Sequence, residues 1–224
     1  MNNFVLITSV INTPNTPLSY SAVRSVFTRK ERYEQTKKTI KSIKKYIPNC
    51  KIMIVECTDF TKEESDYLND QCDYVVNLWH NKYLHPKIFG LSKSSGEGTM
   101  TIEALKFIIQ NRLSFKNLFK ICGRYWINKD FNYNIYDTDK FVFKKIDGNK
   151  DNIFTSFYKI PFNKINHLLQ FLQNAEKIGV LERCIGYEVL FGFYIQSIDP
   201  NQLNLIDKIG YEGQVTVCGT NYVG

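Results

Sequence analysis

Three short apolar runs, separated by helix-like segments, constrain the fold of this chain more than any other feature. The runs FVLITSVI (4–11), KIMIVEC (51–57) and DYVVNLW (73–79) are rich in β-branched residues, as buried strands are. Helical patterns lie between them, over 33–47 and 61–70. This β-α-β-α-β order predicts a parallel sheet covered by helices. The carboxyl ends of its strands would share one edge, where such sheets bind ligands.

The rest of the chain predicts a mobile loop over 80–96, a helix over 99–110 and a fourth strand over 118–126. Further strands are predicted over 140–146, 152–160 and 213–219, and further helices over 163–179 and 185–198. The later strands would form a mixed extension of the sheet. No repeat or low-complexity linker interrupts the chain, so we expect a single α/β domain over 1–224 with two functional halves, 1–127 and 128–224.

The composition indicates a packed globular protein and argues against a disulfide-rich or membrane-spanning one. The chain has 224 residues, of which 43% are hydrophobic, and this is enough for a packed globular fold. Its six cysteines form no CxxC pair and mostly lie in or beside apolar runs, which favours free thiols in a reducing compartment. No signal-peptide pattern and no segment of transmembrane length is present. We therefore expect a cytoplasmic protein without a transmembrane segment.

The formal net charge of +7 suits a nucleic acid, an anionic membrane surface or a phosphorylated ligand. The basic residues form no single long run, and no zinc-finger, homeodomain or RNP pattern occurs. A solvated basic face is therefore the favoured interpretation, and no nucleic-acid partner is expected.

The segment LSKSSGEGT (91–99) is glycine-rich and precedes a predicted helix. Gly96 and Gly98 would let backbone amides approach a ligand, the helix start favours anions, and Lys93 would reach a phosphate. The alternative is an ordinary flexible loop with a helix cap. The segment matches neither a Walker A loop nor GxGxxG.

The segment GRYW (123–126) ends the fourth predicted strand. Arg124 there could pair with a diphosphate through two parallel hydrogen bonds, and an aromatic ring could stack on a base or a sugar. Because neighbouring side chains of a strand point to opposite faces, at least one of Tyr125 and Trp126 would belong to the core.

Two groups of carboxylates are candidates for chemistry. Asp137 and Asp139 form an Asp-x-Asp pair that could hold Mg²⁺ or Mn²⁺, although a polar turn before a strand is the favoured interpretation. Glu188 lies among apolar residues, where a carboxylate is either a general base with a shifted pKa or a helix-start cap. The three histidines show no metal-ligand spacing with cysteine.

Several segments together resemble a known family: 12–56, 92–105, 119–127, 155–160 and 186–191. They are similar to the small glycosyltransferase domains encoded by large DNA viruses of algae and protists, which have a GT-A-like fold. The resemblance implies a central, mostly parallel sheet with helices on both sides. It also implies a nucleoside-diphosphate sugar donor, most plausibly UDP-linked, and a glycan or glycoprotein hydroxyl as acceptor. The setting would be the host cytoplasm if the protein is viral.

The resemblance also implies a donor site in the first half and an acceptor side in the second. The base and ribose would lie near the ends of the first strands, and the diphosphate or sugar near the glycine-rich segment and the fourth strand. The implied donor-binding residues are Thr8, Val10, Asn12, Arg24, Glu56, Lys93, Gly96, Gly98, Gly123 and Tyr125. Glu188 is implied as the general base of an inverting transfer.

The fourth strand of this fold normally ends in an Asp-x-Asp motif that holds a divalent cation, but here the place reads Gly123-Arg124-Tyr125. Two solutions stay open. Arg124 supplies the positive charge to the leaving diphosphate as a catalytic residue, or Mn²⁺ or Mg²⁺ is held by carboxylates elsewhere, such as Asp137 and Asp139. The metal ligands are unknown from sequence.

Three other functions compete with glycosyl transfer. The missing Asp-x-Asp favours a nucleotide-sugar-binding domain without catalysis, as one module of a larger enzyme. The positive charge and the aromatics favour a nucleic-acid-binding protein with salt-dependent affinity. A nucleotidyltransferase on a similar α/β sheet is a weaker alternative.

Overall fold

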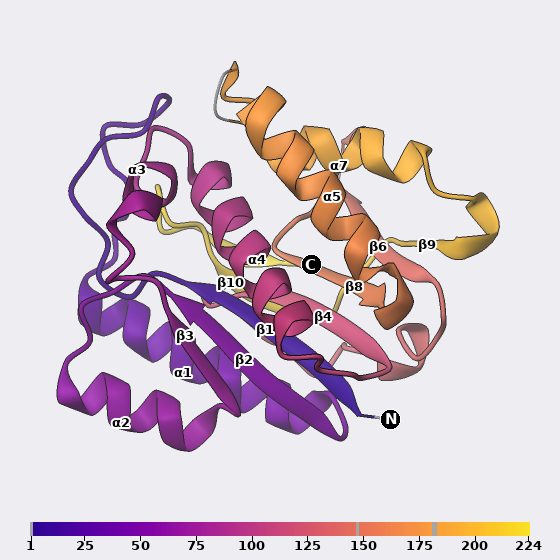
Figure 1. Ribbon diagram of the computed structural model, residues 1–224, viewed down its shortest axis with the longest axis horizontal. Coiled ribbons are helices and arrows are strands. Elements are labelled where there is room, and N and C mark those ends of the chain that lie inside the picture. Colours follow the sequence, from indigo (N-terminus) through magenta and orange to yellow (C-terminus); the bar gives the residue numbers. More distant parts are fainter. Residues whose placement is uncertain (1, 147, 181–182) are drawn as a thin grey trace.

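The computed structural model describes residues 2–146, 148–180 and 183–224. The main sheet of this described chain has eight strands, in the order β3-β2-β1-β4-β8-β6-β7, with β9 beside β6. Its strands are β1 (Asn3–Ser9), β2 (Cys50–Glu56), β3 (Tyr74–Asn77), β4 (Asn117–Cys122), β6 (Phe141–Ile146), β7 (Asn149–Ile153), β8 (Phe157–Pro161) and β9 (Leu203–Ile206). The sheet crosses the molecule between two layers of helices (Figure 1).

Strands β1 to β4 are mutually parallel, with β1 between β2 and β4. Strand β8 is antiparallel to β4 and begins the mixed extension, in which β6 pairs antiparallel with β7 and β8 and parallel with β9. This arrangement confirms the predicted fold class. Because the four parallel strands end at one edge, the segments that follow β1 and β4 lie close together there, and Gly123 N–H donates to the Thr8 carbonyl at 2.9 Å.

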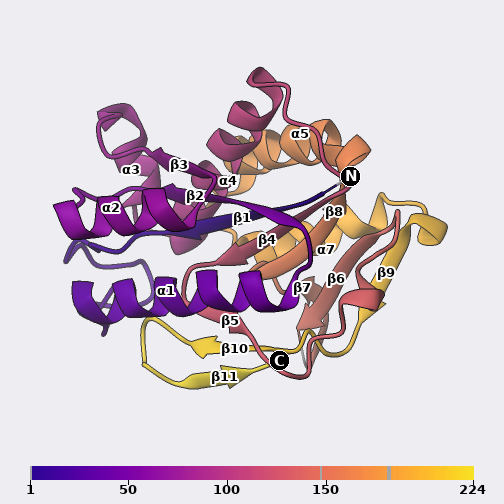
Figure 2. The same cartoon turned by 90° about the horizontal axis from the view of Figure 1, so that it is seen from below.

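Side chains of β1 alternate between two cores. Phe4 and Leu6 face the core shared with α4 (Lys93–Gln110), α5 (Ile165–Ala175) and α7 (Tyr187–Gln196). Val5 and Ile7 face the core shared with α1 (Arg29–Tyr46) and α2 (Lys62–Gln71). Each fully buried side chain of this kind stabilises the fold by roughly 1.5–3 kcal/mol. Figure 2 shows α1 and α2 on one side of the main sheet and α4 and α5 on the other.

A smaller sheet has the order β11-β10-β5 and consists of β5 (Tyr125–Ile127), β10 (Tyr211–Gln214) and β11 (Asn221–Val223). It corrects two strand predictions. The predicted strand 118–126 divides into β4 and β5, because the chain turns at Gly123–Arg124 and pairs next with β10. The predicted strand 213–219 is replaced by β10 and β11, which flank a turn.

The predicted loop over 80–96 is wrong. It contains a 3-10 turn (Lys82–Leu84), the short helix α3 (His85–Ile88) and the start of α4. Gly96 and Gly98 therefore lie inside α4 and not in a loop before it. A Cβ atom on Gly96 would lie 2.6 Å from the Ile88 carbonyl oxygen, and one on Gly98 would overlap the ring of Tyr187. Both glycines let neighbouring elements pack closely.

In the second half of the chain, other elements begin and end at residues that differ from the prediction. The predicted strand 152–160 divides into β7 and β8, and β9 was missed because a run of four residues is too short to establish a strand's period. The predicted helix 163–179 consists of a 3-10 turn (Phe162–Lys164), α5 and a π-helical turn (Glu176–Val180). Two more 3-10 turns span Tyr133–Ile135 and Pro200–Gln202.

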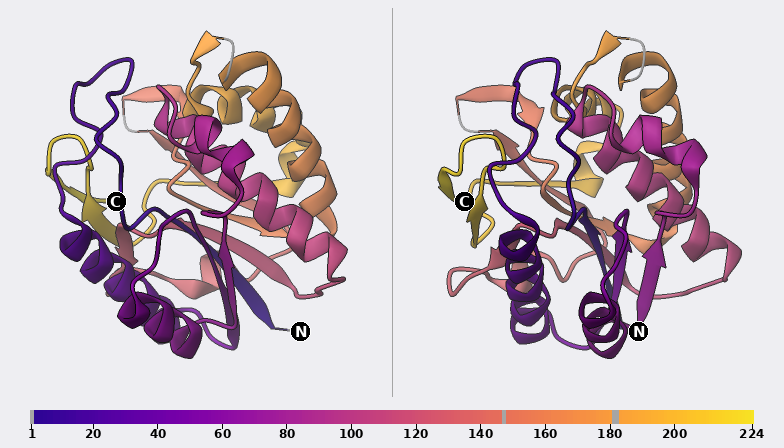
Figure 3. Two further views of the ribbon diagram at one scale, coloured as in Figure 1. Left: turned by 60° about the vertical axis from the view of Figure 1, so that its left-hand side comes forward. Right: turned by 90° about the vertical axis from the view of Figure 1, so that its left-hand side faces the viewer.

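The long segment between β1 and α1 reaches across the carboxyl edge of the sheet toward α3 (Figure 3). Arg24 fastens it there. Its Nε donates to the Thr16 carbonyl at 3.1 Å, and its Nη2 donates to the carbonyls of Phe89, at 2.8 Å, and Gly90. This arginine therefore joins the segment before α1 to the segment before α4.

Candidate functional site

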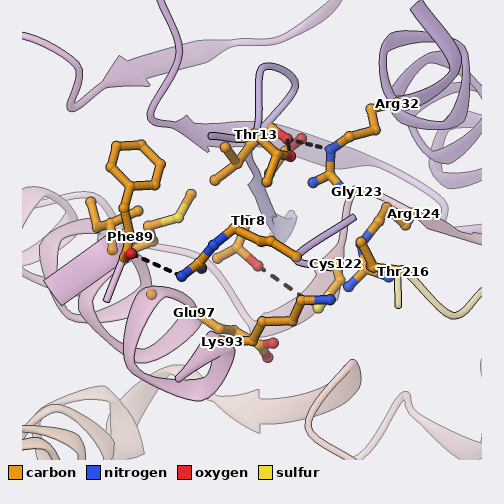
Figure 4. A pocket seen from close by; sticks show the side chains of 16 residues that line it. Thr8, Thr13, Arg32, Phe89, Lys93, Glu97, Cys122, Gly123, Arg124 and Thr216 are labelled. Carbon is orange, nitrogen blue, oxygen red and sulfur yellow. Dashed lines mark hydrogen bonds between the residues drawn. The ribbon is translucent and has the colours of Figure 1, made fainter. Parts of the chain in front are cut away.

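A pocket opens at the carboxyl ends of β1 and β4 (Figure 4). The end of β1 contributes Thr8 and Val10, and the turn after β4 contributes Gly123 and Arg124. The start of α4 completes the wall with Lys93, Gly96 and Glu97, and α1 adds Arg32. We call this the cation pocket, because Arg24, Arg32, Lys93 and Arg124 all line it.

Arg32 is the most enclosed of these cations, at 7% exposure. Its Nε donates to the Val10 carbonyl at 2.6 Å, and no carboxylate in the described chain forms an ion pair with it. Burial, followed by the charge of Arg124, lowers its pKa to about 9. A buried guanidinium with unused donors is poorly satisfied without an anion.

Lys93 is in a similar position at the first residue of α4. Burial, and then the charges of Arg124, Arg32 and Arg24, lower its pKa to about 7. Like charges gathered in a partly dry pocket repel one another, and a negative charge placed among them would relieve that repulsion.

The polar face of α1 holds the turn that carries Arg124. Thr36 Oγ1 is 3.3 Å from the Gly123 carbonyl oxygen, and Thr39 Oγ1 donates to the Tyr125 carbonyl at 2.7 Å. Arg124 itself donates from Nη1 to the Gln214 carbonyl at 3.0 Å. The arginine is thus fixed by both the large sheet and the small one, which limits the entropy that it would lose on binding a ligand.

Glu97 is the carboxylate that lines the cation pocket, and a lysine already neutralises it. Lys120 of β4 is fully buried, and its ammonium contacts the Glu97 carboxylate and donates to the Thr155 carbonyl at 2.9 Å. Burial alone would lower the pKa of Lys120, but the attraction of Cys122 and Glu97 raises it. Glu97 therefore removes little of the pocket's positive charge.

A second pocket adjoins the first and shares Lys93, Glu97, Cys122 and Arg124 with it. We call it the hydroxyl pocket, because serine, threonine and tyrosine side chains line much of it: Ser19, Tyr20, Ser92, Ser94, Tyr125, Thr155 and Ser156. Glu188, in the first turn of α7, also lines it.

Glu188 accepts hydrogen bonds from Thr155 Oγ1 and Ser94 Oγ, each at 3.4 Å. Burial raises its pKa, and the nearby charge of Glu97 raises it further. A carboxylate with raised proton affinity, beside cations and facing a polar pocket, has the properties of a general base.

The structure does not bring all the candidate donor-binding residues to the two pockets. Glu56 is fully buried and accepts hydrogen bonds from the backbone N–H groups of Ile11 and Cys57 and from the Thr58 hydroxyl. Its pKa is raised by burial. Asn12 donates to Asp59 at 2.8 Å. Both side chains order the segment after β1. Gly98 faces the Tyr187 ring inside the protein.

Asp137 and Asp139 lie far from the cation pocket in the fold. Asp137 forms an ion pair with Lys116 at 2.5 Å, and Lys116 immediately precedes β4, at the opposite end of that strand from Arg124. In the described part of the chain, no group of three or more His, Cys, Asp or Glu side chains could hold a metal ion. The end of β4 itself reads Gly123-Arg124-Tyr125 and contributes a cation, not a carboxylate, to the pocket.

Arg32 and Thr216, which both line the cation pocket, were not among the candidates from the sequence. Arg32 lies beside the apolar positions of α1, where an arginine is normally solvated. A polar row at helical spacing, Arg32, Thr36 and Thr39, was the available signal. Thr216 lies in the turn after β10, and its buried hydroxyl has no hydrogen-bond partner among the described residues.

The fold resembles that of a solved glycosyltransferase. The crystal structure of the apo-form glycosyltransferase GlyE of Streptococcus pneumoniae TIGR4 aligns with a TM-score of 0.53 at 12% sequence identity. The alignment covers 92% of this chain and 45% of GlyE, so this chain spans less than half the length of that protein. No protein-family model matches the sequence, and no curated protein matches it.

The fold is thus glycosyltransferase-like: a mixed α/β structure with a central, mostly parallel sheet flanked by helices. Of the helices in the ranges that the structure describes, none is long and apolar enough to cross a membrane.

Proposed function

We propose that the protein transfers a glycosyl group from a nucleoside-diphosphate sugar to a hydroxyl of a glycan or glycoprotein acceptor. One observation carries the proposal: in a glycosyltransferase-like fold, a pocket lined by four cations lies at the carboxyl edge of the parallel strands. An anionic leaving group such as a diphosphate fits that charge, and ligands of open α/β sheets bind at that edge.

The donor occupies the cation pocket. Its diphosphate lies among Arg32, Lys93 and Arg124, and the Phe89 ring offers an apolar surface for the nucleobase. The family resemblance favours uridine as the nucleoside. The sugar extends toward the side chains that both pockets share.

The acceptor occupies the hydroxyl pocket, beside Glu188. Its hydroxyl oxygen forms a bond to the anomeric carbon while the bond from that carbon to the diphosphate breaks. The hydroxyl proton passes to the Glu188 carboxylate, and the diphosphate leaves with the electron pair and is stabilised by Arg124 and Lys93. A single displacement of this kind inverts the anomeric configuration.

A transfer assay tests the proposal. The protein is incubated with UDP-, GDP-, CDP- and dTDP-sugars and a panel of glycan acceptors, and the product's anomeric configuration is determined by NMR. We expect one nucleotide series to be consumed and an inverted product to form. A retained configuration would exclude the direct displacement, and no product from any donor would contradict the transferase.

The absence of an acidic pair at the end of β4 favours one competing function, a nucleotide-sugar-binding module without catalysis. It predicts that a nucleoside-diphosphate sugar binds in the cation pocket and is recovered unchanged after prolonged incubation with every acceptor. Calorimetry together with the transfer assay separates the two functions.

A further inference from the structure

We propose that Arg32, Lys93 and Arg124 bind the donor's diphosphate directly, so that the reaction requires no divalent cation. This inference rests on the proposed function and specifies how its donor site works. The three residues come from α1, α4 and the β4–β5 turn, and they line one pocket from different sides (Figure 4).

The first argument is that the pocket contains unused hydrogen-bond donors. Arg32 uses only Nε, toward Val10, and Lys93 has no hydrogen bond or ion pair within the described chain. The buried Thr216 hydroxyl also lacks a partner among the residues that the structure describes. Thr216 is a buried donor without a partner, and the remaining N–H groups of Arg32 and Lys93 have no protein partner in the described chain and line the same pocket, so the three are placed for a ligand with several acceptor oxygens.

The second argument is that the carboxylates near the pocket are already engaged. Glu97 is paired with Lys120, and Glu188 lies in the adjoining pocket with Thr155 and Ser94. A divalent cation placed beside the diphosphate would face three positive side chains and one neutralised carboxylate. The same side chains supply the charge that a metal would otherwise supply to the leaving diphosphate.

A consequence is that diphosphate binding is coupled to protonation of Lys93. The groups that act on its ammonium are Arg124, Arg32, Arg24 and Cys218, with Glu97 one turn along α4. In the free protein its pKa is lowered to about 7 by burial and by these cations. A bound diphosphate raises that pKa again. Above pH 7 the complex therefore holds more protons than the free protein, and affinity falls as pH rises.

The test is calorimetric titration with inorganic pyrophosphate in EDTA, with the intact chain. Pyrophosphate carries the shared group of every candidate donor, whatever the base and sugar. We expect saturable binding without metal, weakened roughly ten- to a hundredfold in Arg32→Met, Lys93→Met and Arg124→Met, as for charge-assisted hydrogen bonds. Lys41→Met removes an exposed charge from α1 and is the control, with little effect expected. Circular dichroism checks folding, and Arg124→Lys serves if the Met variants unfold.

The proton coupling has its own readout. Titrations at pH 8 in buffers of different ionisation enthalpy give the protons taken up on binding. The wild type should take up close to one proton more than Lys93→Arg, whose guanidinium stays charged. Equal uptake by the two proteins would remove Lys93 from the diphosphate site.

Each remaining outcome separates this inference from the proposed function. Binding that vanishes in EDTA and returns with Mn²⁺ would overturn the metal-free site but leave the transferase standing. Binding in EDTA without consumption of any sugar nucleotide would support the site and overturn the transferase. Loss in Lys41→Met equal to that in Lys93→Met, or no binding with or without metal, would overturn the site.

Discussion

The cation pocket and the hydroxyl pocket share four side chains but differ in charge. The first is lined by three arginines, a lysine and one neutralised carboxylate. The second is lined by hydroxyl groups, two carboxylates and only the two cations that it shares with the first, Lys93 and Arg124. A substrate that is anionic at one end and rich in hydroxyls at the other would be oriented by this difference alone. Adjoining pockets that differ in this way can therefore set the direction in which such a substrate binds.

The largest expected effect comes from replacing Glu188, the proposed general base in the hydroxyl pocket. Glu188→Gln keeps the size of the side chain but cannot accept a proton. We expect the rate of glycosyl transfer to fall roughly 10²- to 10⁴-fold, with donor affinity unchanged. Glu103→Gln changes a carboxylate of α4 that lies outside both pockets and is the control. Near-normal transfer by Glu188→Gln would show that another group takes the proton.

The pH dependence should report both pockets at once. As the proposed general base, Glu188 must be ionised, and burial and Glu97 raise its pKa, so kcat/KM should rise with pH through a value above that of an ordinary glutamate. As a proposed ligand of the diphosphate, Lys93 must be protonated, so kcat/KM should fall as pH rises above about 7. Lys93→Arg should move the alkaline limb to higher pH and leave the acid limb in place. A profile identical to that of the wild type would separate Lys93 from donor binding.

The next largest effect concerns the stability contributed by the ion pair between Lys120 and Glu97. Lys120→Met leaves the Glu97 carboxylate without its buried partner, and we expect the free energy of unfolding to fall by about 3 kcal/mol in urea titrations. Glu97→Gln together with Lys120→Met should recover part of that loss, because the uncompensated charge is gone. If the double variant is no more stable than Lys120→Met, the pair contributes packing and not charge compensation.

The smallest effect concerns the β4–β5 turn, which carries Arg124, a residue that lines both pockets. Thr39→Val removes the hydrogen bond to the Tyr125 carbonyl and should lower the free energy of unfolding by about 1 kcal/mol. Thr101→Val is the matched control, because the Thr101 hydroxyl donates only to Glu97 within its own helix. A greater loss in Thr101→Val would mean that the Thr39 hydrogen bond does not hold the turn.

Much of the first half followed from sequence because its information is local. The apolar runs at 4–11 and 51–57 and the three-four spacing of α1 predicted β1, β2 and the helix between them. The parallel order predicted that the strand ends share one edge, and the family resemblance placed Thr8 there; in the structure Thr8 and Arg124 line one pocket at that edge.

The sequence predictions were wrong where contacts between segments far apart in the chain determine the structure. Gly96 and Gly98 suggested a phosphate loop, but they are small because Ile88 and Tyr187 pack against α4. The position of Arg32 depends on how α1 lies over the β4–β5 turn. The pairing of Glu97 with Lys120 depends on the packing of α4 over β4. No hydrophobic periodicity and no sequence motif in the chain predicts these contacts.

The cation pocket has a consequence for turnover. When the glycosidic bond to the donor breaks, the nucleoside diphosphate gains negative charge, and the positive side chains that line the pocket are covalently part of the protein and cannot leave with it. In the proposed reaction, the nucleoside-diphosphate product would therefore bind more tightly than the donor. Accumulated nucleoside diphosphate would then slow the proposed transfer, and the rate would depend on how quickly the surrounding medium removes that product.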